Sequence, residues 1–231
     1  MKQNTVMKGL PEQERPYERC ILNGPKSLSD SELMAVILRT GTQGKSALEL
    51  ANELIYSRNK TDGILNIHQW TYQELIRLKG VGKVKAIQIL CISELSKRLA
   101  KAYAAPALSF QNPSSIASYY MEDLRHSKQE ILKLLLLDTK AKLIGSSDIS
   151  KGTINSSIIS PRELFIDALQ MGAVSIILLH NHPSGDPMPS KEDILVTKRI
   201  KEAGKLIGID LLDHIIIGNN CYLSFCEKGI L

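Results

Sequence analysis

Residues 173–193 read AVSIILLHNHPSGDPMPSKED, an apolar run followed by a polar stretch that begins with His180 and His182. The run at 173–179 has the length and the β-branched content of a buried strand, so we expect both histidines at the end of a strand. Residues two apart on a strand point to the same face, and their Cα atoms lie about 6.6 Å apart at about 3.3 Å per residue. The two imidazoles can therefore converge on one ion.

Three prolines and a glycine follow the second histidine: Pro183, Gly185, Pro187 and Pro189. They exclude regular structure and predict a turn, after which a helix begins at Ser190 and runs to about Ala203. The turn brings Asp193 back toward the histidines. Two imidazoles and one carboxylate leave a fourth position open for water, which is typical of catalytic rather than structural zinc. Ser190 and Asp193 also have a local explanation, as the N-cap and a first-turn acid of the helix.

The spacing His180-x-His182-Pro183-x6-Ser190-x2-Asp193 resembles the JAMM signature of the JAB/MPN metallopeptidases, and the residues around it resemble the RadC branch of that superfamily. The resemblance extends over nearly the whole chain, through RPYER at 15–19, LSDSEL at 28–33, LKGVGKVKA at 78–86 and LDHIIIG at 212–218. It implies that His180, His182 and Asp193 bind Zn²⁺. It also implies that Ser190 assists an oxyanion and that an upstream glutamate is the catalytic base.

Hydrolysis of a peptide bond needs a group that takes a proton from the attacking water and passes it to the leaving amine. Glu130 is the first candidate, because the segment EILKLLLL that it begins resembles the first strand in which JAMM enzymes carry this glutamate. Glu163 is the second candidate, although its place in the first turn of a predicted helix explains it without catalysis. Glu192 points about 100° away from Asp193 on a helix. We expect His214 to be a structural histidine on a neighbouring strand.

Helical patterns fill the first half of the chain, at residues 29–40, 45–56, 71–78 and 84–103. Ser29 and Thr71, each followed by Glu three residues later, are candidate capping boxes. An uncharged stretch with two prolines, residues 103–113, is a candidate linker, and strands alternate with helices after it. We therefore predict an α+β chain of two domains, an all-helical domain at 1–105 and an α/β domain at 106–231. The resemblance implies that the second is a JAB/MPN-type mixed β-sheet sandwiched by helices.

Gly80 and Gly82 separate two of these helices in the pattern of a helix-hairpin-helix. Glycine permits positive φ and close backbone approach, which leaves N–H groups at the start of the next helix free to receive a phosphate. Lys83 and Lys85 add positive charge, so we expect weak DNA binding without sequence preference at these four residues. A plain helical turn with surface lysines, or a contact with another protein, explains the same pattern.

The positive charge of the chain is concentrated in its first half. Residues 1–105 hold 16 Lys and Arg against 10 Asp and Glu, while residues 106–231 hold 13 against 14, so a polyanion should prefer the first half. No run approaches the about 18 apolar residues of a membrane span and the start has no apolar signal segment, so we expect a cytoplasmic protein. The four cysteines form no CxxC pair, which argues against a zinc ribbon and favours free thiols.

Two functions are consistent with these features. The first is a zinc-dependent metallopeptidase or isopeptidase that uses a metal-activated water and a glutamate base on an unidentified protein or peptide substrate. The second is a DNA-binding repair or recombination factor whose metal site is structural or vestigial. The hairpin, the basic half and the family's association with DNA repair favour the second. The full set of ligands, serine and glutamate favours the first, because a structural site does not require a base.

Overall fold

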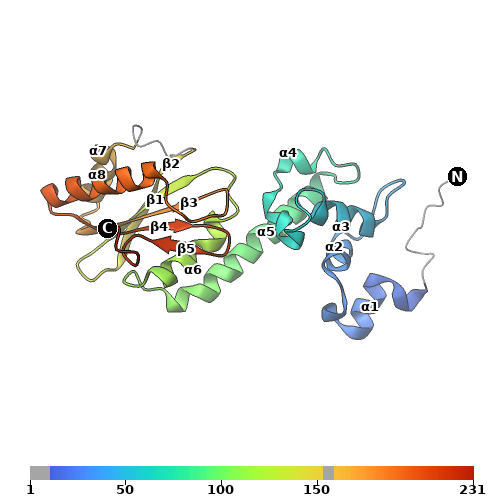
Figure 1. Ribbon diagram of the computed structural model, residues 1–231. Coiled ribbons are helices and arrows are strands. Elements are labelled where there is room, and N and C mark those ends of the chain that lie inside the picture. Colours follow the sequence, from blue (N-terminus) through green and yellow to red (C-terminus); the bar gives the residue numbers. More distant parts are fainter. Residues whose placement is uncertain (1–10, 153–158) are drawn as a thin grey trace. The chain divides into compact units, whose positions relative to one another are not determined.

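The computed structural model describes residues 11–152 and 159–231 (Figure 1). The chain divides into two compact units, Met1–Ser96 and Lys97–Leu231. A helical part followed by a five-stranded mixed sheet with helices confirms the predicted fold class. Helix α5 (Lys83–Ala104) runs without a break across the division between Ser96 and Lys97. The domain boundary after residue 105 stays a prediction.

The first unit consists of short helices. In chain order they are η2 (Glu12–Glu14), α1 (Pro16–Asn23), η3 (Pro25–Ser27), α2 (Asp30–Leu38), α3 (Ala47–Tyr56), η4 (Gly63–Gln69), α4 (Tyr72–Leu75) and the first part of α5, where η marks a 3-10 helix. The capping boxes predicted at Ser29 and Thr71 are both present. Ser46 and Glu49 form a further one, so α3 begins two residues later than predicted, because Ser46 is its N-cap.

The core of the first unit is centred on α3, whose Leu50, Leu54 and Ile55 are fully buried. Trp70, the single tryptophan of the chain, donates from Nε1 to the carbonyl oxygen of Leu54 at 3.0 Å. The guanidinium of Arg58 lies over the Trp70 ring, 4.1 Å from its centroid. The indole is therefore held by a hydrogen bond on its edge and by a cation on its face.

The second unit is built on a mixed sheet. Its elements after α5 are η5 (Ala105–Ala107), α6 (Pro113–Leu124), β1 (Ile131–Leu137), β2 (Leu143–Lys151), α7 (Pro161–Gln170), β3 (Ser175–Asn181), α8 (Lys191–Ile207), β4 (Asp210–Ile217) and β5 (Tyr222–Ser224). The strand order is β2-β1-β3-β4-β5, with β3 and β4 parallel and the other neighbours antiparallel. The parallel pair is joined by α8, as a parallel crossover requires.

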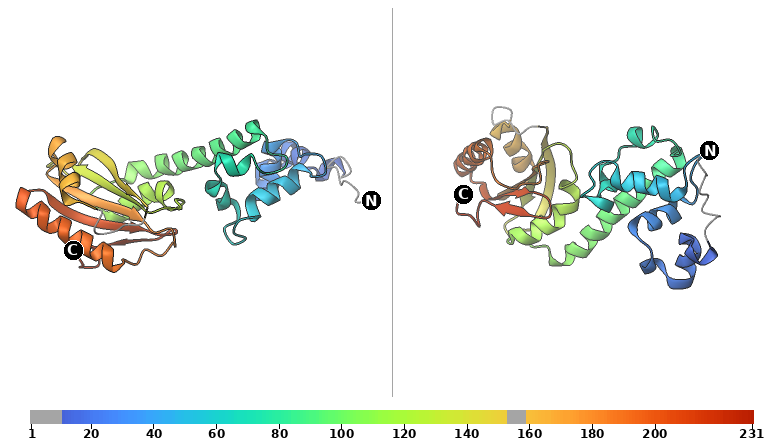
Figure 2. Two further views of the ribbon diagram at one scale, coloured as in Figure 1. Left: turned by 90° about the horizontal axis from the view of Figure 1, so that it is seen from above. Right: turned by 45° about the vertical axis from the view of Figure 1, so that its right-hand side comes forward.

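Alternate residues of the central strands face opposite layers of helix. Leu134 and Leu178 pack in the core beneath α7 and α8, whereas Leu135 and Leu179 pack against α6. Figures 1 and 2 show α6 on the face of the sheet opposite α7 and α8. Both faces are thus covered, which explains why β3 is buried at every residue and reads as a continuous apolar run. His180, two residues after Leu178, faces the α8 side of the sheet.

Helix α8 ends at Ile207, four residues later than predicted. Gly204 lies in the last turn of the helix, and its lack of a side chain lets the backbone at Ile209 pass close to it. A Cβ atom at this position would lie 2.3 Å from the carbonyl oxygen of Ile209. Gly208, with φ of 76°, then ends the helix in the left-handed conformation. Within the described ranges, no helix combines the length and the apolar character that crossing a membrane requires.

Candidate metal centre

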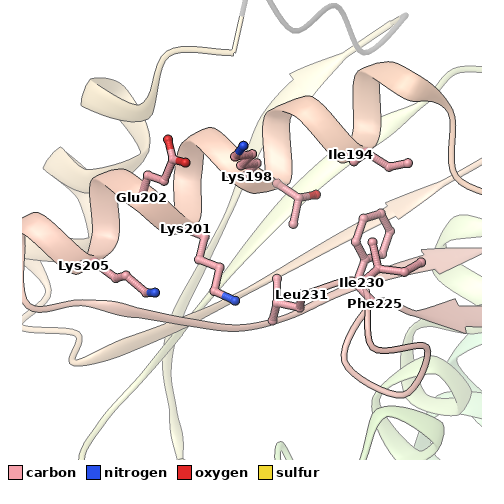
Figure 3. Close-up of a pocket in the computed structure, with 9 residues that line it drawn as sticks. Ile194, Lys198, Lys201, Glu202, Lys205, Phe225, Ile230 and Leu231 are labelled. Atoms are coloured by element: carbon pink, nitrogen blue, oxygen red, sulfur yellow. The ribbon is translucent and has the colours of Figure 1, made fainter.

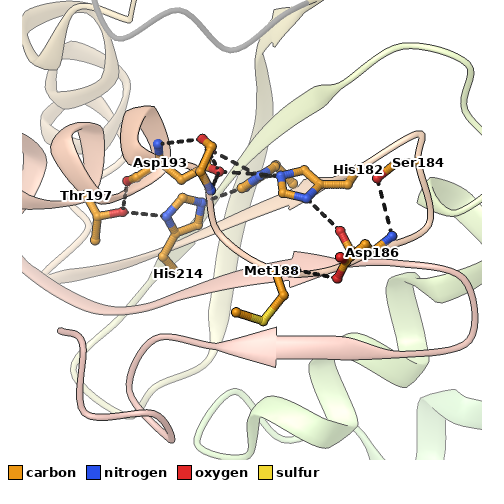
Figure 4. A network of polar contacts seen from close by, with 9 residues as sticks. His182, Ser184, Asp186, Met188, Asp193, Thr197 and His214 are labelled. Carbon is orange, nitrogen blue, oxygen red and sulfur yellow. Dashed lines mark hydrogen bonds and ion pairs between the residues drawn. The ribbon is translucent and has the colours of Figure 1, made fainter.

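The donor atoms of His180, His182 and Asp193 converge at the end of β3. The Nε2 atoms of the two histidines are 3.0 Å apart. Asp193 Oδ1 lies 3.4 Å from His180 Nε2, and Asp193 Oδ2 lies 3.4 Å from His182 Nε2. Candidate ligand atoms of the three residues all lie within 4.8 Å of one another. The structure therefore brings together the three residues that the spacing predicted as metal ligands. Figure 4 shows two of them, His182 and Asp193.

Strand pairing holds both histidines in place. His180 pairs with Leu132 on β1 and with Ile216 on β4, so it lies inside the sheet, fully buried. The backbone N–H of His182 donates to the carbonyl oxygen of Ile217 at 3.0 Å, which extends the pairing by one residue. The turn that the prolines predicted begins only after this bond.

Asp193 is presented by the first turn of α8. Ser190 is the N-cap residue, and its Oγ accepts from Asp193 N at 3.1 Å. In return Asp193 Oδ2 accepts from Ser190 N at 2.7 Å and from Ser190 Oγ at 2.6 Å. The structural explanation of these two residues is thus correct, and the same capping box aims the carboxylate at the histidines. In this arrangement the hydroxyl hydrogen of Ser190 is directed to Asp193 rather than into the pocket.

The other ring nitrogen of His182 determines its tautomer. Nδ1 lies 2.8 Å from the carbonyl oxygen of Asp186, in the turn before α8 (Figure 4). A carbonyl oxygen only accepts, so Nδ1 carries the hydrogen and the neutral ring has its lone pair on Nε2. Ligating histidines in proteins show the same pattern, with the outer N–H bound to a carbonyl or carboxylate.

Burial and neighbouring charges shift the pKa values of the three groups in different directions. Burial lowers the pKa of His180 well below its usual value, and the neighbouring His214 lowers it further. The contact with Asp193 raises the pKa of His182. Burial acts to raise the pKa of Asp193, but the bonds to His182 and Ser190 and the nearby His180 lower it overall. The carboxylate is therefore charged and His180 is neutral at neutral pH, as metal ligands must be.

An open pocket of about 460 Å³ borders the three donors. It is lined by Glu130, His182, Pro183, Ser184, Ser190, Glu192 and Asp193. Ile131 N donates to Asn181 Oδ1 at 2.9 Å, and Asn181 Nδ2 donates to Gln129 O at 3.2 Å, so the backbone on both sides of Glu130 is tied to the end of β3. Glu130 thus reaches the pocket from the start of β1, although it lies far from the histidines in the sequence.

The other carboxylates considered as a base lie differently. Glu163 is in the first turn of α7 and does not line the pocket. Glu192 does line it, which the helix angle to Asp193 did not predict. The angle compares two side chains on one helix, whereas the pocket also extends over the N-terminus of that helix. Glu192 is therefore a second carboxylate available to the pocket.

A second pocket, of about 350 Å³, lies along another side of α8 (Figure 3). Its lining combines Lys198, Lys201 and Lys205 with apolar side chains from the end of the chain, Phe225, Ile230 and Leu231. Among the residues that the structure describes, no histidine or cysteine lines it, so this pocket lacks the imidazole and thiolate donors of a transition-metal site.

Two of the four residues predicted to contact DNA, Gly80 and Lys85, have structural roles in the first unit. Gly80 has φ of 100°, and a Cβ atom there would lie 2.8 Å from Thr42 Cβ, so this position requires glycine. Gly82 is not in the positive-φ region. The ammonium of Lys85 donates to the carbonyl oxygens of Thr40, Gly41 and Gly80, and burial lowers its pKa. Lys83, by contrast, is exposed.

Comparison with known families agrees with this geometry. The model described as RadC-like JAB domain matches residues 110–230, which contain the whole sheet and the three donors. The chain belongs to the RadC-like JAB family. A second model, the UPF0758 N-terminal domain, matches residues 7–87. A UPF0758 protein of Clostridium botulinum is 49% identical and one of Clostridium beijerinckii 44% identical, each over 100% of both chains.

The donor set of this RadC-like domain fits a metal ion. The lone pair of His182 Nε2 points at His180 Nε2 only 3.0 Å away, with the Asp193 carboxylate beside both. Two nitrogens this close need either a hydrogen on His180 Nε2, which His182 Nε2 would accept, or a metal ion between the donors. Two imidazoles and one carboxylate are neutral and anionic donors of the kind that hold divalent transition metals.

Proposed function

We propose that this protein is a zinc-dependent hydrolase of amide or isopeptide bonds. The observation that supports it most is the position of Glu130, whose side chain lines the same pocket as His182, Ser190 and Asp193. A metal site that only stabilised the fold would need neither an open pocket nor a carboxylate in its wall. Two histidines and one carboxylate also match the protein ligands of known catalytic zinc sites.

The proposed mechanism assigns a task to each residue. Bound Zn²⁺ supplies a Lewis acid that makes water nucleophilic near neutral pH. Glu130 takes a proton from the attacking water and passes it to the leaving nitrogen. Ser190 holds the Asp193 carboxylate through the capping box. To stabilise an oxyanion, the Ser190 hydroxyl must rotate away from Asp193 Oδ2.

Zinc content and hydrolysis, measured on the same samples, test this proposal. Full-length protein is assayed against a peptide and isopeptide library as purified, after chelation, and after Zn²⁺ is restored. Loss of hydrolysis on chelation and recovery with Zn²⁺ are expected. Hydrolysis that is unaffected by complete metal removal contradicts the proposal.

DNA binding by the first unit is a second candidate function. It is favoured by the excess of 16 basic over 10 acidic residues in 1–105 and by the exposed Lys83 beside the Gly80 turn. This function needs no metal, so binding should survive chelation and weaken steeply with salt. A cytoplasmic location is consistent with both candidates.

A further inference from the structure

His214 lies on β4 beside the metal site and has no task in the proposed mechanism. It pairs with Leu178 on β3, so its side chain faces the same side of the sheet as His180. It is 1% exposed, and Phe225 stacks on its ring with centroids 4.8 Å apart and an angle of 27°. Its two ring nitrogens contact His180 and Thr197. Figure 4 shows the contact with Thr197. These contacts define the orientation of the ring.

A series of hydrogen bonds links the carbonyl oxygen of Asp193, through Thr197 and His214, to His180. The carbonyl oxygen sets the direction of every bond in this series. Thr197 Oγ1 lies 2.6 Å from the carbonyl oxygen of Asp193, one turn earlier on α8. A carbonyl oxygen only accepts, so the Thr197 hydroxyl donates its hydrogen to Asp193 O. Thr197 Oγ1 must then accept from His214 Nδ1, which is 2.6 Å away.

The same reasoning determines the tautomer of His180. Neutral His214 with its hydrogen on Nδ1 has a lone pair on Nε2, and this atom lies 2.7 Å from His180 Nδ1. His180 Nδ1 therefore donates, and the lone pair of His180 is left on Nε2, the atom beside His182 and Asp193. If the series ran the other way, His180 would carry its hydrogen on Nε2, where it would block a metal ion.

We propose that His214, oriented by Thr197, is a positioning residue that holds His180 in the tautomer able to bind a metal ion. The series begins at the backbone of one ligand, Asp193, and ends at the ring of another, His180, so it also ties α8 to β3 and β4. This proposal rests on the proposed metal site. Outer hydrogen-bond partners of metal ligands change metal affinity by about 10- to 100-fold when they are removed.

A matched pair of variants at Thr197 provides the test. Thr197→Val keeps the shape of the side chain and removes the hydroxyl, whereas Thr197→Ser keeps the hydroxyl. A second pair at the ring is His214→Phe, which retains an aromatic ring against Phe225, and His214→Gln, whose amide oxygen can accept from His180 Nδ1. The measurements are Zn²⁺ affinity by competition with a chromophoric chelator, and the ¹⁵N chemical shifts of His180 in metal-free protein.

In the parent protein the ¹⁵N shifts should show His180 with its hydrogen on Nδ1. Thr197→Val and His214→Phe should lower Zn²⁺ affinity by about 10- to 100-fold and mix in the other tautomer. Thr197→Ser and His214→Gln should retain most of the parental Zn²⁺ affinity and most of the parental His180 tautomer. If a His214 variant does not fold, the comparison of Thr197→Val with Thr197→Ser still tests the proposal. Unchanged affinity and unchanged His180 shifts in folded Thr197→Val would overturn the proposal.

The two proposals fail in different ways. A parent protein that binds no Zn²⁺ contradicts the proposed function. The His180 tautomer in metal-free protein still tests the role of His214, because it is read without metal. A parent His180 with its hydrogen on Nε2 overturns the role of His214 even where Zn²⁺ binds.

Discussion

Ser190 donates its hydroxyl hydrogen to Asp193 Oδ2 at 2.6 Å while accepting from the Asp193 backbone at 3.1 Å. One pair of residues thus caps α8 and orients the carboxylate of the candidate metal centre. Helix stability and metal affinity should respond together to changes at Ser190, because both depend on the same two hydrogen bonds.

We expect Ser190→Ala to destabilise the protein by about 1 kcal/mol, the usual cost of losing a serine N-cap. It should also weaken Zn²⁺ binding, because Asp193 Oδ2 keeps only the backbone N–H of residue 190 as a local donor. Ser190→Thr retains a capping hydroxyl and serves as the control. Thermal unfolding and Zn²⁺ competition measure the two effects, and a Ser190→Ala protein that matches Ser190→Thr in both would disprove the coupling.

The metal ligands themselves should give an all-or-none result. The parent protein should carry one Zn²⁺ per chain, and His182→Ala should lose it, because one imidazole and one carboxylate remain. Elemental analysis of the purified proteins measures this. The control is Glu163→Ala, which removes an exposed carboxylate that does not line the pocket. Equal metal content in parent and His182→Ala would show that the ion binds elsewhere.

Glu130→Gln separates a catalytic from a structural metal site. Glutamine has nearly the same shape but cannot take the proton from water, so fold and zinc content should remain while turnover falls by about 10²- to 10⁴-fold. Glu163→Gln is the matched control, since Glu163 does not line the pocket. A Glu130→Gln protein with the parental rate would move the role of base to another residue. Glu192 would then be tested first, because it lines the pocket.

Lys83 is the better position for a test of DNA binding through the hairpin. A change at Lys85 would also remove its hydrogen bonds to the backbone of the first unit. Lys83 is exposed, so Lys83→Glu should weaken binding. It should also make the plot of log K against log salt concentration shallower, by about 0.9 for each phosphate that the protein no longer neutralises. Lys140→Glu makes the same change of charge at an exposed turn of the second unit. Fluorescence anisotropy over a salt series measures both, and identical salt slopes would argue against the hairpin as a DNA-binding site.

Lys85→Met should destabilise the first unit, whether that unit binds DNA or another protein. Its ammonium donates to three backbone carbonyls, of Thr40, Gly41 and Gly80, and the substitution leaves these acceptors without that donor. Trp70 fluorescence reports unfolding of this unit, because the chain has no other tryptophan. A Lys85→Met protein with the parental unfolding midpoint would show that these bonds add no net stability.

Acid should destabilise the first unit through Glu74. Hydrogen bonds from Arg58 and from the backbone and side chain of Thr71 lower the pKa of Glu74 to about 2, below the 4.5 of an unperturbed glutamate. The unfolded chain therefore binds the proton more readily, so this contribution is complete above pH 4.5 and is lost as the pH falls toward 2. Glu74→Gln should flatten the pH dependence of Trp70-monitored unfolding in that window. An unchanged pH profile would mean that other carboxylates dominate.

Sequence alone determined the features that depend on residues close together in the chain. The period of two along a strand places His180 and His182 on one face, and a capping box spans only the few residues from Ser190 to Asp193. The capping boxes at Ser29 and Thr71 are confirmed for the same reason. Local geometry of this kind is set by backbone dihedrals and needs no knowledge of the rest of the fold.

Tertiary structure decided the features that depend on which strands pair and in which register. Pairing of β1 with β3 brings Glu130 to the pocket, and pairing of β3 with β4 brings His214 to His180. A shift of either register by one residue would turn these side chains to the opposite face of the sheet. Lys85 likewise reads as a surface lysine until the fold places the carbonyl oxygens of Thr40 and Gly41 beside its ammonium, because those acceptors lie more than 40 residues earlier in the chain.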